Sequence, residues 1–255
     1  MKRFILILVI LIANNATGSA QQKANPKDTE AWTPVPKIVQ APKNSLSAPD
    51  DAIILFGGDH MDQWLTAKDQ SPAKWTVANG EFTVKKGTGN IQTKRSFLNY
   101  QMHIEWKIPT NITGSGQARG NSGVFLGSTG NGDEGYELQV LDSYTNTTYS
   151  NGQAGSIYKQ FIPLVNASRK PGEWQSYDII WTAPTFYENG TLKSAARVTV
   201  LHNGLLIQNN IELQGETVYI GPPFYKKHGP LPIKLQDHGD PSEPISFRNI
   251  WIREL

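Results

Sequence analysis

The sequence predicts an all-β fold in which antiparallel strands form a sandwich or a barrel. From residue 53 onward, apolar and polar residues alternate with the period of two that is typical of half-buried strands, whereas a helical period is almost absent. Turn residues separate these stretches at spacings of about 8–12 residues, as in known sandwiches and barrels. No internal repeat stands out, which argues against a propeller or a β-helix.

Residues 1–20 have the composition of a secretory signal peptide. Lys2 and Arg3 precede an apolar run at residues 4–13, and small residues follow up to Ala20. The run is shorter than the ~20 residues that a spanning helix needs, so a membrane anchor is the weaker alternative. No cysteine follows the run to carry a lipid. We therefore expect a periplasmic or secreted protein that has no membrane span once this segment is removed.

Residues 21–50 predict a Pro-rich extended segment, either flexible or laid along the surface. They contain five prolines and show no sustained periodicity. Trp32 is a candidate for docking, because an exposed tryptophan in such a segment is uncommon. The remaining residues, 51–255, are expected to form one globular domain, and the 7 Trp, 9 Tyr and 9 Phe of the chain can fill a sizeable core.

Within residues 51–255 the pattern predicts roughly a dozen strands. The pairs Asn79-Gly80 and Asn203-Gly204 each separate two alternating stretches, and both residue types accept the positive φ angles of a two-residue hairpin turn. Residues 100–108 alternate without interruption and predict a long strand with one apolar face. Shorter strands are expected at residues 124–126, 136–141, 155–158, 177–181, 233–236 and 245–251, and short helical turns near residues 59–65 and 67–74.

Composition excludes several classes of function. Without Lys2 and Arg3 of the expected leader, the 24 basic residues fall to 22 and equal the 22 acidic ones. A neutral chain without a block of like charges is a poor candidate for binding nucleic acid. The absence of cysteine rules out disulfides, thiol catalysis and cysteine-ligated metals. The histidines lack zinc-site spacing, and no phosphate-loop, dinucleotide or Gly-x-Ser-x-Gly motif is present.

The strand expected at residues 136–141 carries the most informative polar residues. Glu137 and Gln139 point to one face of this strand, while Leu138 and Val140 point into the core. A one-residue bulge would bring Asp142 to the polar face as well. Carboxylates and amides bind sugar hydroxyls, and aromatic rings stack on the C–H faces of sugars. The row therefore indicates a carbohydrate site, unless these are ordinary solvated strand residues.

Two other polar groups accompany this row. Arg119 and Asn121 lie in a glycine-rich stretch that precedes the strand expected at residues 124–126. Gln236, Asp237 and His238 follow the strand expected at residues 233–236. A plain turn is the alternative for the second group, because Asp favours turns and the following glycine accepts a positive φ angle.

Four ordered motifs run through the globular part of the chain. They are Asn121-Ser-Gly-Val-Phe, Gly135-Tyr-Glu-Leu-Gln-Val-Leu-Asp142, Gly155-Ser-Ile-Tyr158, and Pro232-Ile-Lys-Leu-Gln-Asp-His-Gly239 with the later Phe247-Arg-Asn-Ile250. Together they resemble the 3-keto-disaccharide hydrolase domain family of secreted bacterial proteins, over about residues 51–255. The resemblance implies a concanavalin A-like jelly-roll sandwich of two antiparallel sheets, sugar chemistry on its concave face, and glycoside-cleaving activity.

The polar row is similar in spacing to the Glu-x-Asp-x-x-Glu row of laminarinase-type glucanases, which share this fold. In this chain Gln139 replaces the central Asp and Asp142 replaces the last Glu. Retaining glycosidases need two carboxyl groups about 5–5.5 Å apart. A keto-sugar route needs only one base, one acid and a group that polarises the ketone. We therefore expect proton abstraction at C2 of a 3-keto-glycoside or 3-keto-disaccharide, elimination at C1, and addition of water.

In this scheme Glu137 is the base, His238 or Asp142 is the acid, and Arg119 or Lys159 faces the enolate oxygen. The sequence indicates no certain cofactor. A divalent cation bound by Glu137, Asp142 and a histidine is an alternative to Arg119 or Lys159 as the group that faces the enolate oxygen. Two alternatives remain open: a non-catalytic carbohydrate-binding module of lectin-like fold, and a structural or adhesion protein. The residues expected to bind the carbohydrate substrate are Arg119, Asn121, Gln139, Tyr158, Lys159, Gln236 and Glu105.

Overall fold

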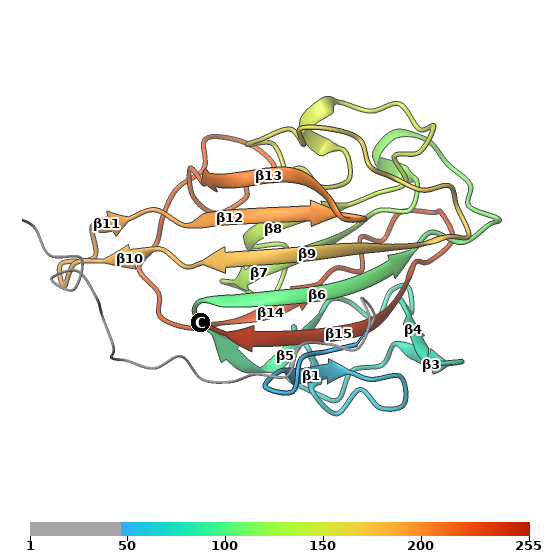
Figure 1. The fold of residues 1–255 in the computed structure, drawn as a ribbon, viewed down its shortest axis with the longest axis horizontal. Coiled ribbons are helices and arrows are strands. Elements are labelled where there is room, and N and C mark those ends of the chain that lie inside the picture. The colour runs from blue at the N-terminus through green and yellow to red at the C-terminus, as the bar shows by residue number, and fades with distance from the viewer. Residues whose placement is uncertain (1–46) are drawn as a thin grey trace, which may run out of the picture. The chain divides into compact units, whose positions relative to one another are not determined.

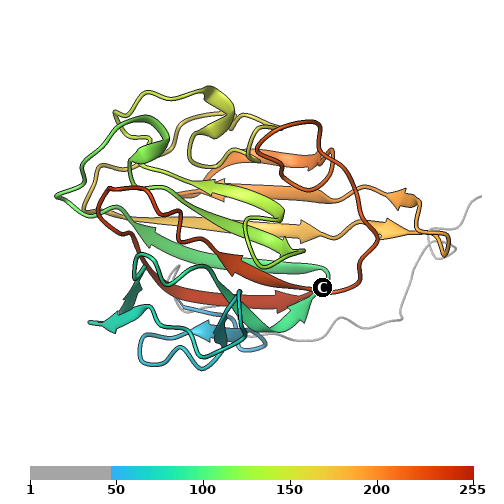
Figure 2. The ribbon, with the colours of Figure 1, turned by 180° about the vertical axis from the view of Figure 1, so that it is seen from behind.

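The computed structural model describes residues 47–255, so the expected leader, Trp32 and nearly all of the Pro-rich segment lie outside the described residues. The described chain forms strands β1–β15 and short 3₁₀ turns. Two large antiparallel sheets pack face to face, and a small two-stranded ribbon extends from one end (Figure 1 and Figure 2). The expected all-β sandwich of concanavalin A-like, jelly-roll type is confirmed.

One sheet has eight strands in the order β13-β12-β9-β6-β15-β4-β3, with β1 paired to β15. Its members are β1 (Ile53–Phe56), β3 (Thr76–Ala78), β4 (Glu81–Thr83), β6 (Tyr100–Lys107), β9 (Trp174–Thr182), β12 (Arg197–His202), β13 (Leu205–Glu212) and β15 (Ser246–Glu254). The separate ribbon consists of β10 (Thr185–Phe186) and β11 (Leu192–Ser194).

The other sheet has five strands in the order β2-β5-β14-β7-β8. Strand β14 pairs antiparallel with both β5 and β7, although it is far from both in the sequence. This pairing brings the segment after β14 close to the segments that flank β7 and β8, which Figure 2 shows from the side of this sheet. The five strands are β2 (Trp64–Thr66), β5 (Ile91–Phe97), β7 (Ser122–Ser128), β8 (Gly135–Val140) and β14 (Leu231–Leu235).

The apolar faces of the two sheets meet in the core. Along β6, the alternate residues from Tyr100 to Trp106 are fully buried, as the sequence pattern predicts. Two buried phenols connect the sheets: Tyr100 donates to Leu126 O at 2.7 Å, and Tyr177 donates to Gln139 O at 2.8 Å. These bonds satisfy the buried hydroxyl groups and connect strands β7 and β8 of the smaller sheet to the larger sheet.

Both predicted hairpin turns are confirmed. Asn79 and Gly80 have φ angles of 54° and 78° and connect β3 to β4. Asn203 and Gly204 have φ angles of 52° and 81° and connect β12 to β13. Positive φ at both central positions matches the twist of the flanking strands, which explains why Asn-Gly occurs at each turn.

The strand expected at residues 155–158 is wrong. Ile157 makes only isolated bridges, to Leu138 and Phe161. Gly155 and Lys159 have φ angles of 82° and 59°, and this left-handed backbone interrupts an extended chain on both sides of Ile157. The segment is therefore a loop that lies against β8.

The expected helical turns are also wrong. Residues 59–65 and 67–74 contain non-helical turns, and the short strand β2 begins within the first range. The 3₁₀ turns lie elsewhere, at η2 (Gly116–Ala118) and η3 (Ser150–Gly152).

The uninterrupted alternation expected at residues 245–251 is wrong, because β15 contains a bulge. Asn249 has a φ angle of 47°, and the register with β6 shifts between Arg248 and Trp251. After the bulge Ile250 enters the core, whereas Trp251 stacks on His103 with ring centroids 5.6 Å apart. One extra residue thus reverses the faces of the residues that follow it.

Candidate functional site

A cavity of about 410 Å³ lies on the outer face of the five-stranded sheet. On β8, Glu137 and Gln139 line this cavity, while Leu138 and Val140 are fully buried in the core. The faces predicted for this strand are therefore confirmed. The cavity is lined by Gln117, Asn121, Asp133, Glu137, Gln139, Tyr149, Tyr158, Thr217, Tyr219, Gln236 and His238.

Glu137 is a deeply buried acid in this cavity, with only 6% of its surface exposed. Burial raises the pKa of Glu137 to about 8, the negative charge of Asp133 adds to the rise, and the ammonium of Lys234 opposes it. A carboxyl group with this pKa is mostly protonated at neutral pH but has a substantial ionised fraction. It can therefore both accept and donate a proton near neutrality.

The position of this carboxyl group depends on its neighbours on β7 and β8. A β-carbon at Gly123 would lie 2.6 Å from Glu137 Oε1, so only glycine leaves the carboxyl group its place. The Gln139 amide, turned so that its nitrogen faces β7, donates to Ser122 O at 2.9 Å and to Glu137 Oε1 at 3.3 Å. Strand β7 thus leaves room for the carboxyl group, and Gln139 on β8 donates a hydrogen bond to it.

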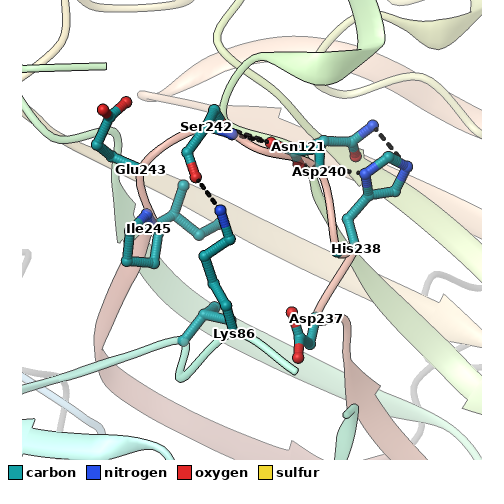
Figure 3. A pocket seen from close by; sticks show the side chains of 11 residues that line it. Lys86, Asn121, Asp237, His238, Asp240, Ser242, Glu243 and Ile245 are labelled. Atoms are coloured by element: carbon teal, nitrogen blue, oxygen red, sulfur yellow. Dashed lines mark hydrogen bonds and ion pairs between the residues drawn. The ribbon is translucent and has the colours of Figure 1, made fainter. Parts of the chain in front are cut away.

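His238 lies at the edge of the same cavity. Figure 3, which draws a second pocket that shares His238 and Asn121 with this cavity, shows the His238 ring between Asn121 and Asp240. Its Nε2 is 3.2 Å from Asn121 Nδ2, and its Nδ1 is 3.2 Å from Asp240 Oδ2. Because Asn121 Nδ2 is a donor, this contact fits a neutral ring that donates its Nδ1 proton to Asp240. Desolvation acts to raise the pKa of Asp240, but hydrogen bonds from His238 and Ser242 outweigh it and lower the pKa to about 2. The ionised Asp240 therefore orients the imidazole.

Three tyrosines and a lysine form the rim of the cavity. The hydroxyl groups of Tyr149 and Tyr158 are 2.6 Å apart. Lys159 Nζ donates to Tyr219 O at 2.7 Å and lies 4.1 Å from the Tyr219 ring centroid. Burial, and then the hydrogen bond with Tyr149, raise the pKa of Tyr158 well above its ordinary value, so its phenol stays protonated. Lys159 borders the cavity without lining it.

Arg119 and Asp142 do not line the cavity, contrary to expectation. Strand β8 ends at Val140, so the expected bulge that would turn Asp142 toward Glu137 does not form. The Asp142 carboxylate, 2% exposed, instead accepts a hydrogen bond from Arg119 Nε at 2.7 Å. Arg119 also donates to Ile112 O at 3.1 Å. The pair braces the loops before β7 and after β8.

Glu105 lies in the other sheet and lines a separate hollow of about 330 Å³. Its carboxylate accepts hydrogen bonds from Arg248 Nε at 2.6 Å and from Asn249 Nδ2 at 2.8 Å. Desolvation acts to raise its pKa, but hydrogen bonds from His103, Asn249 and Arg248 outweigh it and lower the pKa to about 2. The expectation that Glu105 contacts the same substrate as Glu137 is therefore wrong.

The cavity brings together residues that the sequence separates widely. Glu137, Gln139, Asn121, Tyr158, Gln236 and His238 were all candidates and all line it. The sequence analysis missed other lining residues because they lie in loops or at their edges, where no alternating pattern marks them. These are Gln117, Asp133, Tyr149, Thr217 and Tyr219.

Lys234 on β14 is a buried charged residue close to Glu137 that the sequence analysis also missed. Its side chain is fully buried, and its Nζ donates to the carbonyl oxygens of Gly130, Gly132 and Glu134. Burial lowers the pKa of Lys234 to about 8. A lone lysine in the apolar run of residues 231–235 was the sequence feature that could have revealed it. Lys234 holds the loop that carries Asp133 and also acts on the charge of Glu137.

We expect Lys234→Met to raise the pKa of Glu137 above about 8, because it removes the cation that opposes the effect of burial. It should also lower the free energy of unfolding by roughly 1–3 kcal/mol, since three carbonyl groups lose a donor. The pH dependence of Glu137 ionisation, followed by carboxyl NMR, and chemical denaturation check both effects. Lys193→Met, at an exposed position on β11, is the control. An unchanged Glu137 titration would contradict the proposed coupling.

The described residues do not assemble the metal site that the sequence allows. Within residues 47–255, no three His, Cys, Asp or Glu side chains are arranged to hold a metal ion. The set of Glu137, Asp142 and a histidine fails because Asp142 is turned to Arg119. Over the same residues, no helix has the length and apolar character required to cross a membrane.

The fold and the cavity define a class of protein: a β-sandwich of lectin and glucanase type with a sugar-sized site of amides, tyrosines and a buried acid on one sheet. Residues 51–253 match the model of the 3-keto-alpha-glucoside-1,2-lyase-like domain, so the chain belongs to this family, whose function concerns glycosides. No curated protein matches the sequence.

Solved structures agree with this assignment. A provisionally named glycosyl hydrolase from Parabacteroides distasonis ATCC 8503 is 54% identical, with a TM-score of 0.85, over 91% of this chain and 97% of that chain. A second protein with the same description and source is 22% identical, with a TM-score of 0.58, over 81% of this chain and all of that chain. The first is a close relative, and the second shows the shared fold.

Proposed function

We propose that this protein is an enzyme that cleaves 3-keto-glycosides, including 3-keto-disaccharides, in the cavity on β8. The observation that carries the proposal is Glu137, a carboxyl group with a pKa of about 8 in a cavity whose other lining groups are amides, hydroxyl groups, an imidazole and the carboxylate of Asp133. Membership in a family described as 3-keto-alpha-glucoside-1,2-lyase-like supports the substrate class.

In the proposed reaction, Glu137 in its ionised form takes the proton from C2 of the sugar, which the ketone at C3 has acidified. The electron pair of the C2–H bond passes to the ketone oxygen and forms an enolate. When the enolate collapses, a C1–C2 double bond forms and the bond from C1 to the leaving oxygen breaks. Addition of water at C1, with return of a proton to C2, completes hydrolysis.

Two other residues receive roles in this scheme. Tyr158 retains its phenolic proton because its pKa is raised, so it is a hydrogen-bond donor for the enolate oxygen. His238, oriented by Asp240, is the group that protonates the leaving oxygen, for which it carries a second proton, on Nε2, in place of the contact with Asn121. Arg119 and Asp142 are left out of the reacting set, because each neutralises the other away from the cavity.

The second candidate function is a non-catalytic carbohydrate-binding module. It is favoured by the same lining of amides and tyrosines, which would bind sugar hydroxyls and C–H faces without any chemistry. The raised pKa of Glu137 favours the enzyme over the carbohydrate-binding module, since binding alone does not need an acid whose pKa is near neutral pH.

The test compares a 3-keto-glycoside with its unoxidised parent, each with and without a chelator. We expect turnover of the 3-keto compound only, because the C2 proton of the parent is not acidic. Deuterium at C2 should slow the reaction if proton abstraction limits the rate, and solvent deuterium should appear at C2 of the product. Binding of both sugars without turnover would favour the carbohydrate-binding module and overturn the proposal.

We further propose that the protein acts in the periplasm or outside the cell, on the basis of the leader composition at residues 1–20. Fractionation of cells that express the full chain, with N-terminal sequencing of the product, checks this location.

A further inference from the structure

Exposure increases from the floor of the cavity to its mouth. Glu137 is 6% exposed, whereas Tyr149 is 42% and Tyr219 is 72% exposed, and all three line the same cavity. Tyr158 connects the two levels, because it hydrogen-bonds to Tyr149 and its pKa responds to the charge of Glu137. The acid therefore lies deep, and open aromatic rings lie at the entrance.

We propose that Tyr149 and Tyr219, together with Lys159, form a subsite for the leaving group of the substrate, with Tyr158 at its inner edge toward the reacting ring, and that this leaving group is a neutral sugar ring. We call these four residues the tyrosine rim. The inference rests on the proposed function for the direction in which the substrate lies. It adds a preference for disaccharides over glycosides with a small leaving group.

The reaction proposed at Glu137, in the deep part of the cavity, determines the direction in which the substrate lies. A base at Glu137 must reach C2 of the reacting ring, and the bond that breaks is at the adjacent carbon, C1. The reacting ring therefore occupies the deep part of the cavity, and the group attached at C1 extends toward the exposed end. Tyr149 and Tyr219, the most exposed tyrosines of the lining, lie there.

Lys159 holds the tyrosine rim in a defined arrangement, although the rim is exposed. Its backbone has a φ angle of 59°, which is uncommon for a lysine, and its N–H donates to Asn151 O at 2.8 Å. Its Nζ donates to Tyr219 O at 2.7 Å and lies within 5.9 Å of all three tyrosine ring centroids. One lysine thus ties the loop after β8 to the loop between β13 and β14.

The composition of the tyrosine rim favours a neutral sugar. Tyrosine rings present flat faces to sugar C–H groups, and their hydroxyl groups donate and accept hydrogen bonds as sugar hydroxyls do. The ammonium of Lys159 has three N–H donors, of which Tyr219 O accepts one. Among the residues that the structure describes, the cavity lining itself contains two carboxyl groups, Asp133 and Glu137, and no lysine or arginine, so it does not favour an anionic leaving group.

The test measures binding, so that it does not depend on turnover. The Glu137→Gln full chain is titrated by calorimetry with a 3-keto-disaccharide of glucose and with methyl 3-keto-glucoside. We expect the disaccharide to bind more tightly, and Tyr219→Ala in the same background to reduce that preference by roughly three- to tenfold. Tyr219→Phe should keep most of it, and affinity for the methyl glycoside should stay nearly constant.

Tyr187→Ala is the matched control, because Tyr187 is 54% exposed but lies outside the cavity lining. Equal affinity for the two probes, or an equal loss for both in Tyr219→Ala, would overturn the subsite. Turnover by the wild-type chain is measured separately with the same probes. Absence of turnover together with a disaccharide preference would overturn the enzyme proposal and leave the tyrosine rim as a sugar-binding subsite.

Discussion

Replacement of Glu137 by glutamine is expected to reduce turnover of a 3-keto-glycoside by about 100- to 10,000-fold, the range that a general acid–base group contributes. Glutamine keeps the size and the hydrogen-bonding oxygen of the side chain but cannot take the C2 proton. The change should appear mainly in kcat, because contacts to the bound sugar remain. Steady-state kinetics with the 3-keto substrate measures it.

The pH dependence gives this prediction a second readout. For the wild-type chain, ionisation of Glu137 should make kcat/KM rise about tenfold for each pH unit up to about 8. Stability should change in the opposite direction. Because the folded pKa is about 8 against 4.5 for the free side chain, unfolding becomes easier as the pH rises between these values and the penalty then stays constant. Glu137→Gln should abolish this rise in activity and remove the contribution of Glu137 to the pH dependence of stability.

Glu216→Gln is the matched control for this substitution. Glu216 is buried to a similar degree, with 5% of its surface exposed, but it does not line the cavity. If the loss of turnover in Glu137→Gln does not come simply from replacing a buried carboxyl group, Glu216→Gln should leave turnover within about a factor of two of the wild-type value. Retained turnover in Glu137→Gln would remove Glu137 from the role of base.

Replacement of Asp142 by alanine is expected to lower the free energy of unfolding by about 2–4 kcal/mol. The Asp142 carboxylate is 2% exposed and neutralises Arg119, whose side chain is 22% exposed. Alanine would leave the guanidinium partly buried without its counter-ion, and it would also remove the acceptor of the Tyr144 N–H. Urea denaturation measures the loss. At temperatures where the variant is folded, kcat should remain within about threefold of the wild-type value.

Two comparisons separate this structural role from a catalytic one. Glu254→Ala breaks the ion pair with Arg95, in which both side chains are 50% exposed, and it should cost no more than about 1 kcal/mol. The double variant Arg119→Met with Asp142→Leu removes both charges and should recover part of the lost stability. A stable Asp142→Ala chain with turnover reduced a hundredfold would instead return Asp142 to the reacting set.

Period-two patterning predicted the all-β class, the long strand β6 and the two Asn-Gly hairpins, because these depend on local geometry. The same reasoning placed Glu137 and Gln139 on the outer face of β8, since side chains alternate along any strand. It was wrong at residues 155–158, where left-handed backbone interrupts the extended chain, and in β15, where the bulge at Asn249 reverses the alternation.

The sequence alone was therefore sufficient for the strand pattern, the outward acid of β8 and the resemblance to a family, all of which are encoded over short stretches. Only the tertiary structure decided which groups surround Glu137. The insertion of β14 between β5 and β7 brings His238 and Gln236 to the cavity, and loop packing brings the tyrosine rim. The tertiary structure also pairs Asp142 with Arg119 and places Glu105 on the other sheet. The physical reason is that pKa values and contacts depend on burial and on neighbours remote in sequence, which a linear pattern does not contain.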